Sequence, residues 1–527
     1  MRLTYGLVSS SVLMLGLVGG GCSNLADDCA NTSSCPSGGA SSAGSSGASG
    51  KSGSSGSGSD LGGESGSSTG GSSSGTAGSS GSSGDAGSGG GGGGDCDVTA
   101  SPAAEACLVS DDYAVFVAPD GSDDAAGTQA APFASLTRAV ETAGDKLVLV
   151  CSGNYDEHVS VTAGVRVFGG FACDDWSSVA DKPLFKPTTA GPALSIDTVT
   201  DEVLIENVAF EVGDAVAAGA TALTAVVNAS ANVTLRAVLL TAGKGKAGAS
   251  GTLTSFTFPD RSELDGNNAN GTTGGQPKVV ECPGAAETSG GIGGAAAPGG
   301  QSGGPGTPDL AGPGGEGGTP GSDCVAGVGR NGGNAPDSPA AAGASVLGAL
   351  TPVGWSSGSG GDGQNGSPGQ GGGGGASSKT GGGGGGGAGA CGGAGAKGGQ
   401  GGGGSIAIAV LDSTVSIDAS ELVTNDAGGG GGSVAGQPGD KDEGGFGGLQ
   451  AAGACSGGSG GLGGNGGAGG GGAGGISVGV LWQGDVAPTV SANTTIVNGE
   501  AGAKGTGGSA GNNDGIAGVS QKVLELP

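Results

Sequence analysis

The chain has 527 residues, of which 134 are glycine and only 3% are aromatic, and its formal net charge is −29 at pH 7. Glycine brings no side chain to a core and loses the most backbone freedom on ordering, so an ordinary globular core is excluded for much of this length. The acidic balance, 47 Asp plus Glu against 18 Lys plus Arg, leaves no basic stripe to neutralise phosphates and argues against a nucleic-acid partner.

The first 21 residues predict a lipoprotein signal peptide. Arg2 gives a short positive start, an apolar run extends from Leu7 to Val18, and three glycines precede Cys22. The run is too short for a comfortable transmembrane helix, so we interpret it as an export signal. Its ending resembles a bacterial lipobox, although Gly19 stands where leucine is usual; a plainly secreted protein is the alternative. The resemblance implies lipidation of Cys22 and, with Ser23 next, sorting to the outer membrane and cell surface.

The cysteines predict disulfides rather than a metal site. Removing Cys22 from the eleven cysteines leaves ten, an even number in an oxidising compartment. There is no CxxC pair and only one histidine, His158, so loop staples are favoured over zinc. Spacing does not fix connectivity, but sequential pairing predicts Cys29–Cys35, Cys96–Cys107, Cys151–Cys173, Cys282–Cys324 and Cys391–Cys455.

Residues 22–95 form a Ser/Gly-rich tether. Such composition behaves as a flexible coil, with a root-mean-square span on the order of 40 Å. The tether would hold whatever follows clear of a membrane, and any fold begins near Cys96.

Short strands and one helix are predicted from 114 to 171. Strands are indicated around Val115 and Val117, at 147–150, at 159–161 and at 165–168, and an amphipathic helix over 132–143. The segments PDGSDDAAGTQAAPFASLTRAV, SGNYDEHVSV and GVRVFGGF resemble the N-terminal cap and first coils of right-handed parallel β-helices of the pectin-lyase-like superfamily. That resemblance implies an all-β solenoid whose open end is capped by the helix.

An internal repeat points the same way without family knowledge. Residues 194–213 match residues 224–243 at an offset of 30, and two or three short strands per copy are the size of one solenoid coil. The matched pairs are Ile196 with Val226, Val203 with Val233, Ile205 with Leu235, Val208 with Val238, Phe210 with Leu240, and Gly213 with Gly243. A third copy, 182 residues further on, contains Ile408, Val415, Ile417, Ser420 and Leu422, and a looser fourth covers 475–499.

Glycine-rich runs leave the repeats at nearly the same point. The predicted division is therefore 96–243 for the N-terminal part of the β-helix, 244–404 for a first glycine insertion, 405–427 for a rung, 428–475 for a second insertion, and 476–527 for a last rung and tail. Closing a long loop costs only a few kcal/mol, so stacked rungs can tolerate such insertions. We favour disordered insertions over polyproline-II-like segments packed through backbone hydrogen bonds, which the three-residue period of 457–475 also allows. The runs resemble glycine-rich tracts of actinobacterial and myxobacterial surface proteins.

Few residues are candidates for chemistry. In the resembled superfamily, lyases use Arg or Lys with calcium and hydrolases use clustered Asp, which makes Arg166, Arg236, Asp174 and Asp175 the catalytic candidates. None lies in a recognisable motif, and the two arginines alternate with apolar residues as outward-facing side chains do. Asp120, Asp123 and Asp124 could hold calcium in a glycine-containing turn, but Asp-Gly turns are common for backbone reasons. His158 is interpreted as a surface turn residue, and no other cofactor is implied.

The function expected from these features is a non-enzymatic, lipid-anchored surface protein whose β-helix serves adhesion, matrix contact or envelope structure. Its expected partners are the membrane, through the lipid, and polysaccharides or other surface proteins. The alternative is a polysaccharide lyase or glycoside hydrolase, which rests on the superfamily resemblance alone.

Overall fold

The protein is described by a computed structural model over residues 96–527, apart from 285, 311–313, 322 and 442–443. Strands dominate, and most belong to three parallel sheets; the helical elements are α1 (Leu136–Ala143) and the 3-10 turns η1 (Ala106–Leu108) and η2 (Arg261–Glu263). The prediction of an all-β, parallel arrangement is confirmed. No helix in the described part is long and apolar enough to cross a membrane. The signal peptide, the tether, Cys22, Cys29 and Cys35 lie outside the described residues.

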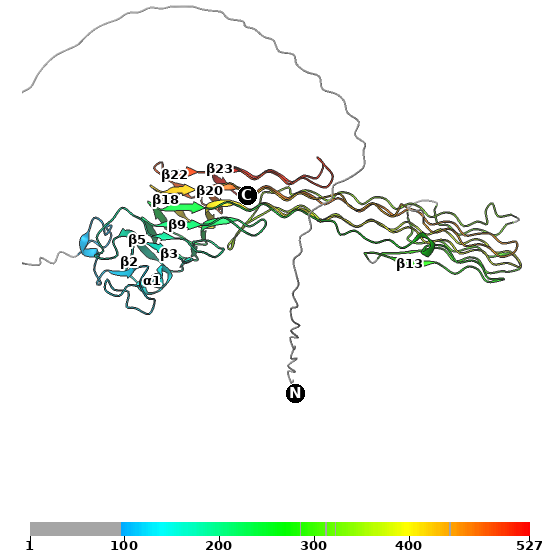
Figure 1. The fold of residues 1–527 in the computed structure, drawn as a ribbon, viewed down its shortest axis with the longest axis horizontal. Coiled ribbons are helices and arrows are strands. Elements are labelled where there is room, and N and C mark those ends of the chain that lie inside the picture. Colours follow the sequence, from blue (N-terminus) through cyan, green and yellow to red (C-terminus); the bar gives the residue numbers. More distant parts are fainter. Residues whose placement is uncertain (1–95, 285, 311–313, 322, 442–443) are drawn as a thin grey trace, which may run out of the picture. The chain divides into compact units, whose positions relative to one another are not determined.

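The three sheets run through the same set of coils (Figure 1). The first sheet contains, in spatial order, β1 (Ala114–Val117), β2 (Leu147–Cys151), β5 (Val165–Phe171), β8 (Val203–Glu206), β11 (Val233–Arg236), β18 (Val415–Asp418) and β21 (Thr489–Val490). The second contains β4 (Val159–Val161), β7 (Leu194–Asp197), β10 (Ala222–Asn228), β17 (Ser405–Leu411), β20 (Ser477–Gln483) and β23 (Ser520–Glu525). The third contains β3 (Asn154–Tyr155), β6 (Leu184–Phe185), β9 (Ala209–Val212), β12 (Leu239–Ala242), β19 (Glu421–Val423) and β22 (Thr495–Val497).

From β7 to β22 the chain visits the second, first and third sheets in turn, so each coil adds one strand to every sheet. β10 pairs in parallel with β17 although the first glycine run separates them, as the repeat predicted. The offset of 30 holds where Ile205 pairs with Leu235. It fails in the second sheet, where Ile196 pairs with Val227 rather than Val226. The turn before β11 is one residue shorter than the turn before β8, which accounts for the slip.

The third copy shows the same slip. Ile408 pairs with Ala225 rather than Val226, whereas Ile417 pairs with Leu235 as predicted. Because adjacent strand residues face opposite sides of a sheet, a one-residue error would exchange the core and solvent faces. The turns therefore set the register that keeps apolar residues inside.

The core lies inside the coils and is built from stacked apolar side chains. In the third sheet the rings of Tyr155, Phe185 and Phe210 stack, with centroids 4.6 and 5.4 Å apart. Full burial of one such side chain stabilises by roughly 1.5–3 kcal/mol, and no single coil could bury its own. In the last complete coil Trp482 pairs with Val410 and is 9% exposed, so a larger ring fills this end of the stack.

Helix α1 packs against β1, β2 and β4 through a buried face that includes Leu136 and Val140. It begins at Leu136 rather than at 132 as predicted, because Ser135 caps it by accepting from the Arg138 N–H and the chain before it makes a bridge to β1. The Glu157 carboxylate accepts the first N–H groups of the helix, from Leu136 at 2.9 Å and Thr137 at 2.8 Å. A carboxylate there also complements the helix dipole.

The described glycine-rich segments are hydrogen-bonded to one another, so the prediction of disordered insertions is wrong for these residues. Segment 358–377 runs antiparallel to segment 382–405, and every third N–H of the first segment donates to a carbonyl of the second. The series begins with the Gly360 N–H, 2.9 Å from the Gly399 carbonyl, and ends with the Gly375 N–H, 2.8 Å from the Gly384 carbonyl. Segment 455–476 continues the array, because Gly387 donates to its Gly458 carbonyl at 3.0 Å. A three-residue period is that of polyproline-II-like helices. We call this array of side-by-side segments, which Figure 1 shows beyond the coils, the glycine bundle.

Close packing explains why glycine recurs at every third position. A Cβ added at Gly386, Gly389 or Gly392 would lie only 1.8, 1.9 or 2.0 Å from a carbonyl oxygen of the antiparallel neighbour. The other columns also contain close-packed glycines, such as Gly384 and Gly387, but they admit small side chains at some places, where Ala388 and Cys391 are fully buried. Backbone hydrogen bonds, rather than apolar area, therefore supply most of the bundle's contacts.

Serine residues mark where the chain returns from the bundle to the coils. Ser405, Ser477 and Ser520 each begin a strand of the second sheet, and each Oγ donates to a carbonyl of the preceding outgoing segment, at 2.7, 3.0 and 2.8 Å. The same hydrogen bond thus recurs at three successive junctions and ties the glycine segments to the coils.

Two hairpins lie within the glycine-rich region: β13 (Val279–Cys282) with β14 (Ala286–Ser289), and β15 (Gly348–Thr351) with β16 (Gly354–Ser357). The second hairpin places Leu350 and Trp355 on the outer face of the second sheet, against Leu223 and Ile406. Trp355 is thereby a packing residue, 7% exposed.

The structure contains disulfides Cys96–Cys107 and Cys151–Cys173, as predicted. The other two described disulfides are Cys282–Cys391 and Cys324–Cys455, so the predictions Cys282–Cys324 and Cys391–Cys455 are wrong. Sequential pairing assumed independent loops. Because the glycine segments lie side by side, each of these bonds instead joins different segments of the bundle.

Candidate functional site

The two candidate arginines lie on the outer side of the first sheet but do not form a site together. Arg166 in β5 is half-buried and its guanidinium donates to the Val98 carbonyl. Arg236 in β11 forms an ion pair with Glu206, its cross-strand neighbour in β8, and the Arg236 Nε lies 2.9 Å from the Glu206 Oε2. Each side chain has a structural partner on the sheet.

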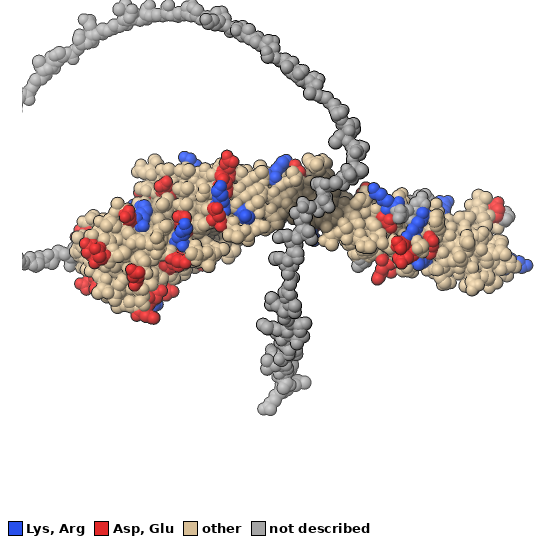
Figure 2. Space-filling view, in the orientation of Figure 1, with Lys and Arg blue, Asp and Glu red and all other residues tan. Residues whose placement is uncertain are grey.

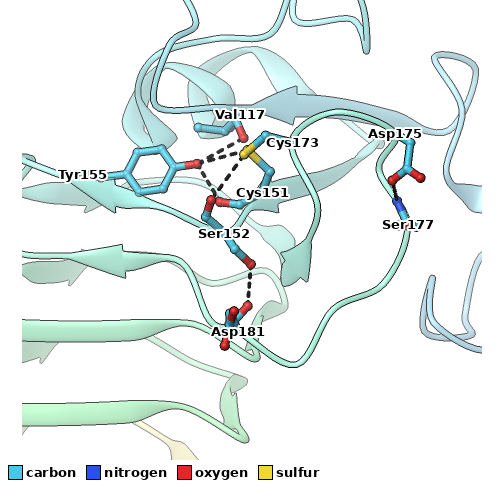
Figure 3. The surroundings of a disulfide bond; sticks show 8 residues. All are labelled: Val117, Cys151, Ser152, Tyr155, Cys173, Asp175, Ser177 and Asp181. Atoms are coloured by element: carbon cyan, nitrogen blue, oxygen red, sulfur yellow. Dashed lines mark hydrogen bonds between the residues drawn. A yellow bond between two sulfur atoms is a disulfide. The ribbon is translucent and has the colours of Figure 1, made fainter.

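The candidate pair Asp174 and Asp175 lies in an exposed turn after β5 (Figure 3 shows Asp175). Hydrogen bonds from Ser177, including its N–H at 2.9 Å, hold the pKa of Asp175 below its ordinary value. Trp176 between them and Ser177 is 5% exposed and packs edge-on against Phe116, with centroids 4.6 Å apart. The ring is therefore part of the packing and offers no platform for a sugar.

A disulfide anchors the same turn (Figure 3). Beside it the Tyr155 hydroxyl donates to the Cys151 carbonyl at 2.8 Å, and Ser152 donates to the Asp181 carbonyl. Burial, with a smaller contribution from Glu157, raises the pKa of Tyr155, so its hydroxyl stays a hydrogen-bond donor. These contacts tie successive turns together.

The three aspartates considered for calcium do not converge. The Asp123 carboxylate is hydrogen-bonded to the residues just before α1. It accepts from the Ala134 and Ser135 N–H groups and from the Ser135 hydroxyl at 2.9–3.0 Å. Asp120 and Asp124 are exposed. Among the residues that the structure describes, no three His, Cys, Asp or Glu side chains form a group that could hold a metal ion.

His158 lies on the surface and links two chain segments. Nδ1 is 2.7 Å from the Pro192 carbonyl, and Nε2 is 2.7 Å from the Thr189 hydroxyl. A carbonyl can only accept, so Nδ1 carries the proton, and in the neutral ring Nε2 accepts from Thr189. Both nitrogens are thus engaged in a turn contact that sequence reasoning did not foresee.

The outer face of the first sheet does carry a shallow polar groove of about 400 Å³. Thr234, Ser416 and Thr489 lie in register on consecutive strands and line it, with Asn232 and Glu202 at its side. Such a row of hydroxyl and amide groups can exchange hydrogen bonds with an uncharged polar partner. We call this surface the hydroxyl groove. Part of its signal is present in the sequence, because Thr234 and Ser416 are separated by the offset of the third repeat copy, whereas Thr489 is placed only by the strand register.

Side-chain oxygens of Asn and Asp residues accept hydrogen bonds from backbone N–H groups at the surface of the glycine bundle. Asn331, Asn334 and Asp337 accept in turn from the N–H groups of Ser459, Leu462 and Asn465 at 2.9–3.0 Å. Their spacing of three matches the bundle period, so each satisfies a backbone donor that faces outward. The period of these Asn and Asp residues is a signal that sequence reasoning missed.

Charged side chains are sparse and mixed in sign on the face in view (Figure 2). Lys186 lies 2.8 Å from Glu211, Lys244 lies 3.0 Å from Asp426, and Lys397 lies 2.7 Å from Asp362. These pairs are largely exposed and contribute little to stability, but they leave broad uncharged areas between them.

No protein-family model, no curated protein and no solved structure matches the chain. The described geometry therefore has to carry any functional argument, and that geometry is an ordered scaffold with a polar groove on one face of its coils.

Proposed function

We propose that the protein is a non-enzymatic, lipid-anchored surface protein whose coils and glycine bundle serve adhesion, matrix contact or envelope structure. The observation that carries this proposal is the bundle, in which N–H groups at every third residue bond neighbouring segments. Glycine and alanine offer almost no side-chain chemistry, but backbone bonds at this density make an ordered extension of the coils. Such an extension suits spacing and contact better than turnover.

In this proposal Cys22 carries the lipid and residues 22–95 span the distance from the outer membrane to the fold. The coils are those of a right-handed parallel β-helix of the pectin-lyase-like superfamily, with α1 as the cap of its first coil. The packing of α1 against β1, β2 and β4 supports the capping role.

The hydroxyl groove is the proposed contact surface of the coils. It presents uncharged donors and acceptors from Thr234, Ser416 and Thr489 in a repeating row. A repeating polar partner such as a neutral polysaccharide can match a row of this kind. Arg166 and Arg236 lie on the same sheet but are engaged with Val98 and Glu206, which fits binding rather than acid–base chemistry.

The proposal is tested by displaying the full chain in a bacterial host that has an outer membrane. Cells are compared with and without the protein for retention under flow on polysaccharide-coated surfaces, and membranes are fractionated. We expect the protein to fractionate with the membrane and to increase retention, and Cys22→Ala to release it and remove the gain. Equal retention of expressing and empty cells would contradict the adhesive role, and membrane retention of Cys22→Ala would contradict lipidation.

The alternative, a polysaccharide lyase or hydrolase, makes a different prediction. Purified protein would then shorten polyuronides, with or without calcium, and single substitution of Arg166, Arg236, Asp174 or Asp175 would reduce that activity. Because the carboxylates and the arginines lack a shared site, we expect unchanged chain lengths on size-exclusion chromatography.

A further inference from the structure

A second cavity lies at a corner of the early coils, between the loops that follow β6 and β9. It has a volume of about 380 Å³ and is lined by residues 187–191, 212–217 and 220–223. In later coils the chain leaves the corresponding corner as glycine segments, whereas here two short loops leave space between them. We call it the corner cavity.

The lining of the corner cavity is mainly apolar. Val212 and Leu223 form part of its wall, and Val216 stands on the loop with 85% of its surface exposed. The hydroxyls of two lining threonines are already engaged, Thr188 with Asp156 at 2.9 Å and Thr189 with His158 at 2.7 Å. Their polar groups are thus committed to the fold, so the wall offers chiefly methyl groups to a ligand.

Asp214 is the charged residue of this lining. Its Oδ1 accepts from the Lys244 N–H at 2.7 Å, and among the described residues Oδ2 has no hydrogen-bond partner. The nearby Lys244 ammonium lies 3.0 Å from Asp426 and makes no salt bridge with Asp214 among the described residues, although Asp426 and, to a smaller extent, Asp214 raise its pKa. The cavity therefore combines an apolar wall with one carboxylate oxygen left to accept.

We propose that the corner cavity binds a small organic cation, an ammonium group attached to an apolar chain or ring. The apolar part would lie against Val212, Val216 and Leu223, and the ammonium would donate to Asp214 Oδ2. With about 30 Å³ for each water-sized group, the volume admits a ligand of roughly a dozen heavy atoms. Pockets of this size and lining, with few polar groups that fix orientation, are typical of small-molecule sites.

An ammonium group on an apolar chain is supplied equally by a free amine or by the side chain of a lysine in another protein. Charge favours either over an anion, since a carboxylate ligand would meet the Asp214 charge. The expected affinity is weak, with a dissociation constant on the order of 1 mM, because ligand and cavity are small and the cavity is open to solvent.

The test is a ligand-observed NMR titration of the mature protein with three probes that share one apolar part. The probes are 4-phenylbutylammonium, 4-phenylbutanol and 4-phenylbutanoate, with Nα-acetyl-lysine methylamide as a fourth arm that separates a lysine side chain from a free amine. We expect the ammonium probe to bind about threefold to tenfold more tightly than the alcohol, and the carboxylate to bind most weakly. Equal binding of ammonium and carboxylate, or no binding, would overturn the proposal.

Two variants locate the effect. Asp214→Asn keeps an acceptor for the Lys244 N–H and should abolish the preference for ammonium over alcohol. Val216→Ser should weaken every probe by about fivefold, the effect of losing about 1 kcal/mol of apolar contact. The matched control is Val325→Ser, since Val325 is 89% exposed in a turn of the glycine bundle. If Val325→Ser changed binding as much as Val216→Ser, the corner cavity would not be the site.

Discussion

Placing one methyl group in a closely packed column of the glycine bundle should break the bundle locally. In Gly386→Ala the new Cβ would lie 1.8 Å from the Gly372 carbonyl oxygen, whereas real Cβ contacts are essentially never under 3.0 Å. The segments must therefore separate by at least 1.2 Å, the difference between these two distances. The hydrogen bond that joins these two segments, 2.8 Å from the Gly372 N–H to the Gly387 carbonyl, would lengthen to about 4.0 Å, beyond hydrogen-bond range.

The loss in the free energy of unfolding of Gly386→Ala follows from these contacts. One lost backbone hydrogen bond costs about 0.5–1.5 kcal/mol, and overpacking costs about 1–3 kcal/mol. Replacing glycine restricts the unfolded chain and offsets about 0.4–1 kcal/mol. We expect Gly386→Ala to lower the free energy of unfolding by about 0.5–4 kcal/mol.

The matched control is Gly429→Ala, because its added Cβ would meet the Ala503 carbonyl oxygen at 3.6 Å, an ordinary contact. Here only the unfolded-state effect remains, so stability should stay unchanged or rise by up to about 1 kcal/mol. Urea unfolding of the two variants and of the unchanged protein, followed by circular dichroism, compares the urea midpoints. If both variants unfolded at the same urea concentration, the side-by-side packing of the glycine segments would be refuted.

Further predictions concern backbone strain, a surface carboxylate and a junction. Ala237 has φ 50°, a left-handed conformation that Asn207 adopts at the equivalent place with φ 57°, so Ala237→Asn should stabilise by about 0.5–1 kcal/mol in urea unfolding; a loss of stability would contradict the strain. Lys397 and the Gly398 N–H hold the pKa of Asp362 below its ordinary value, and Lys397→Gln should raise it in an NMR titration. Because the pKa of Asp362 is lower in the folded state, the carboxylate stabilises the fold above its unfolded pKa, and this stabilisation is lost as the pH falls through the folded pKa. An unchanged pKa of Asp362 in Lys397→Gln would show that Lys397 does not lower it. Ser405→Ala removes a fully buried hydroxyl bonded to the Gly243 carbonyl and should cost about 1–3 kcal/mol, whereas a neutral result would show that the junction needs no such bond.

The coils could be predicted from sequence because their signal is local and repeated. β-branched and other apolar residues recur with the coil, so the repeat alone assigns Ile205, Leu235 and Ile417 to one core column, and their pairing confirms it. The one-residue slip at Ile196 could not be seen, because turn length is set by backbone geometry and the apolar pattern of 224–228 allows either register.

The sequence favours disorder for the segments of the glycine bundle, and the reason is physical. Glycine gives no apolar pattern, and its entropy loss on ordering favours disorder when a segment is considered alone. Order here comes from many segments bonding side by side, which no single segment reveals. The spacing of Asn331, Asn334 and Asp337 carried part of the signal, since each side chain satisfies a donor one bundle period apart.

Of the site residues, sequence reasoning identified exposed charges but could not foresee their partners. The sequence makes Asp123 a calcium candidate, whereas its carboxylate accepts hydrogen bonds from the chain entering α1. The hydroxyl groove and the corner cavity arise from residues that are unremarkable singly. They become surfaces only when successive coils stack, so a site made of Thr234, Ser416 and Thr489 required the register.

The ordered glycine bundle is the central claim, and amide hydrogen exchange over residues 358–405 of the protein tests it most directly. Donors such as those of Gly363, Gly372 and Gly387 are bonded to neighbouring segments at 2.7–3.0 Å, so their exchange should be slowed to rates comparable with those of β10 and β17. Exchange of this segment at the rate of an unstructured chain, while β10 and β17 stay protected, would contradict the account.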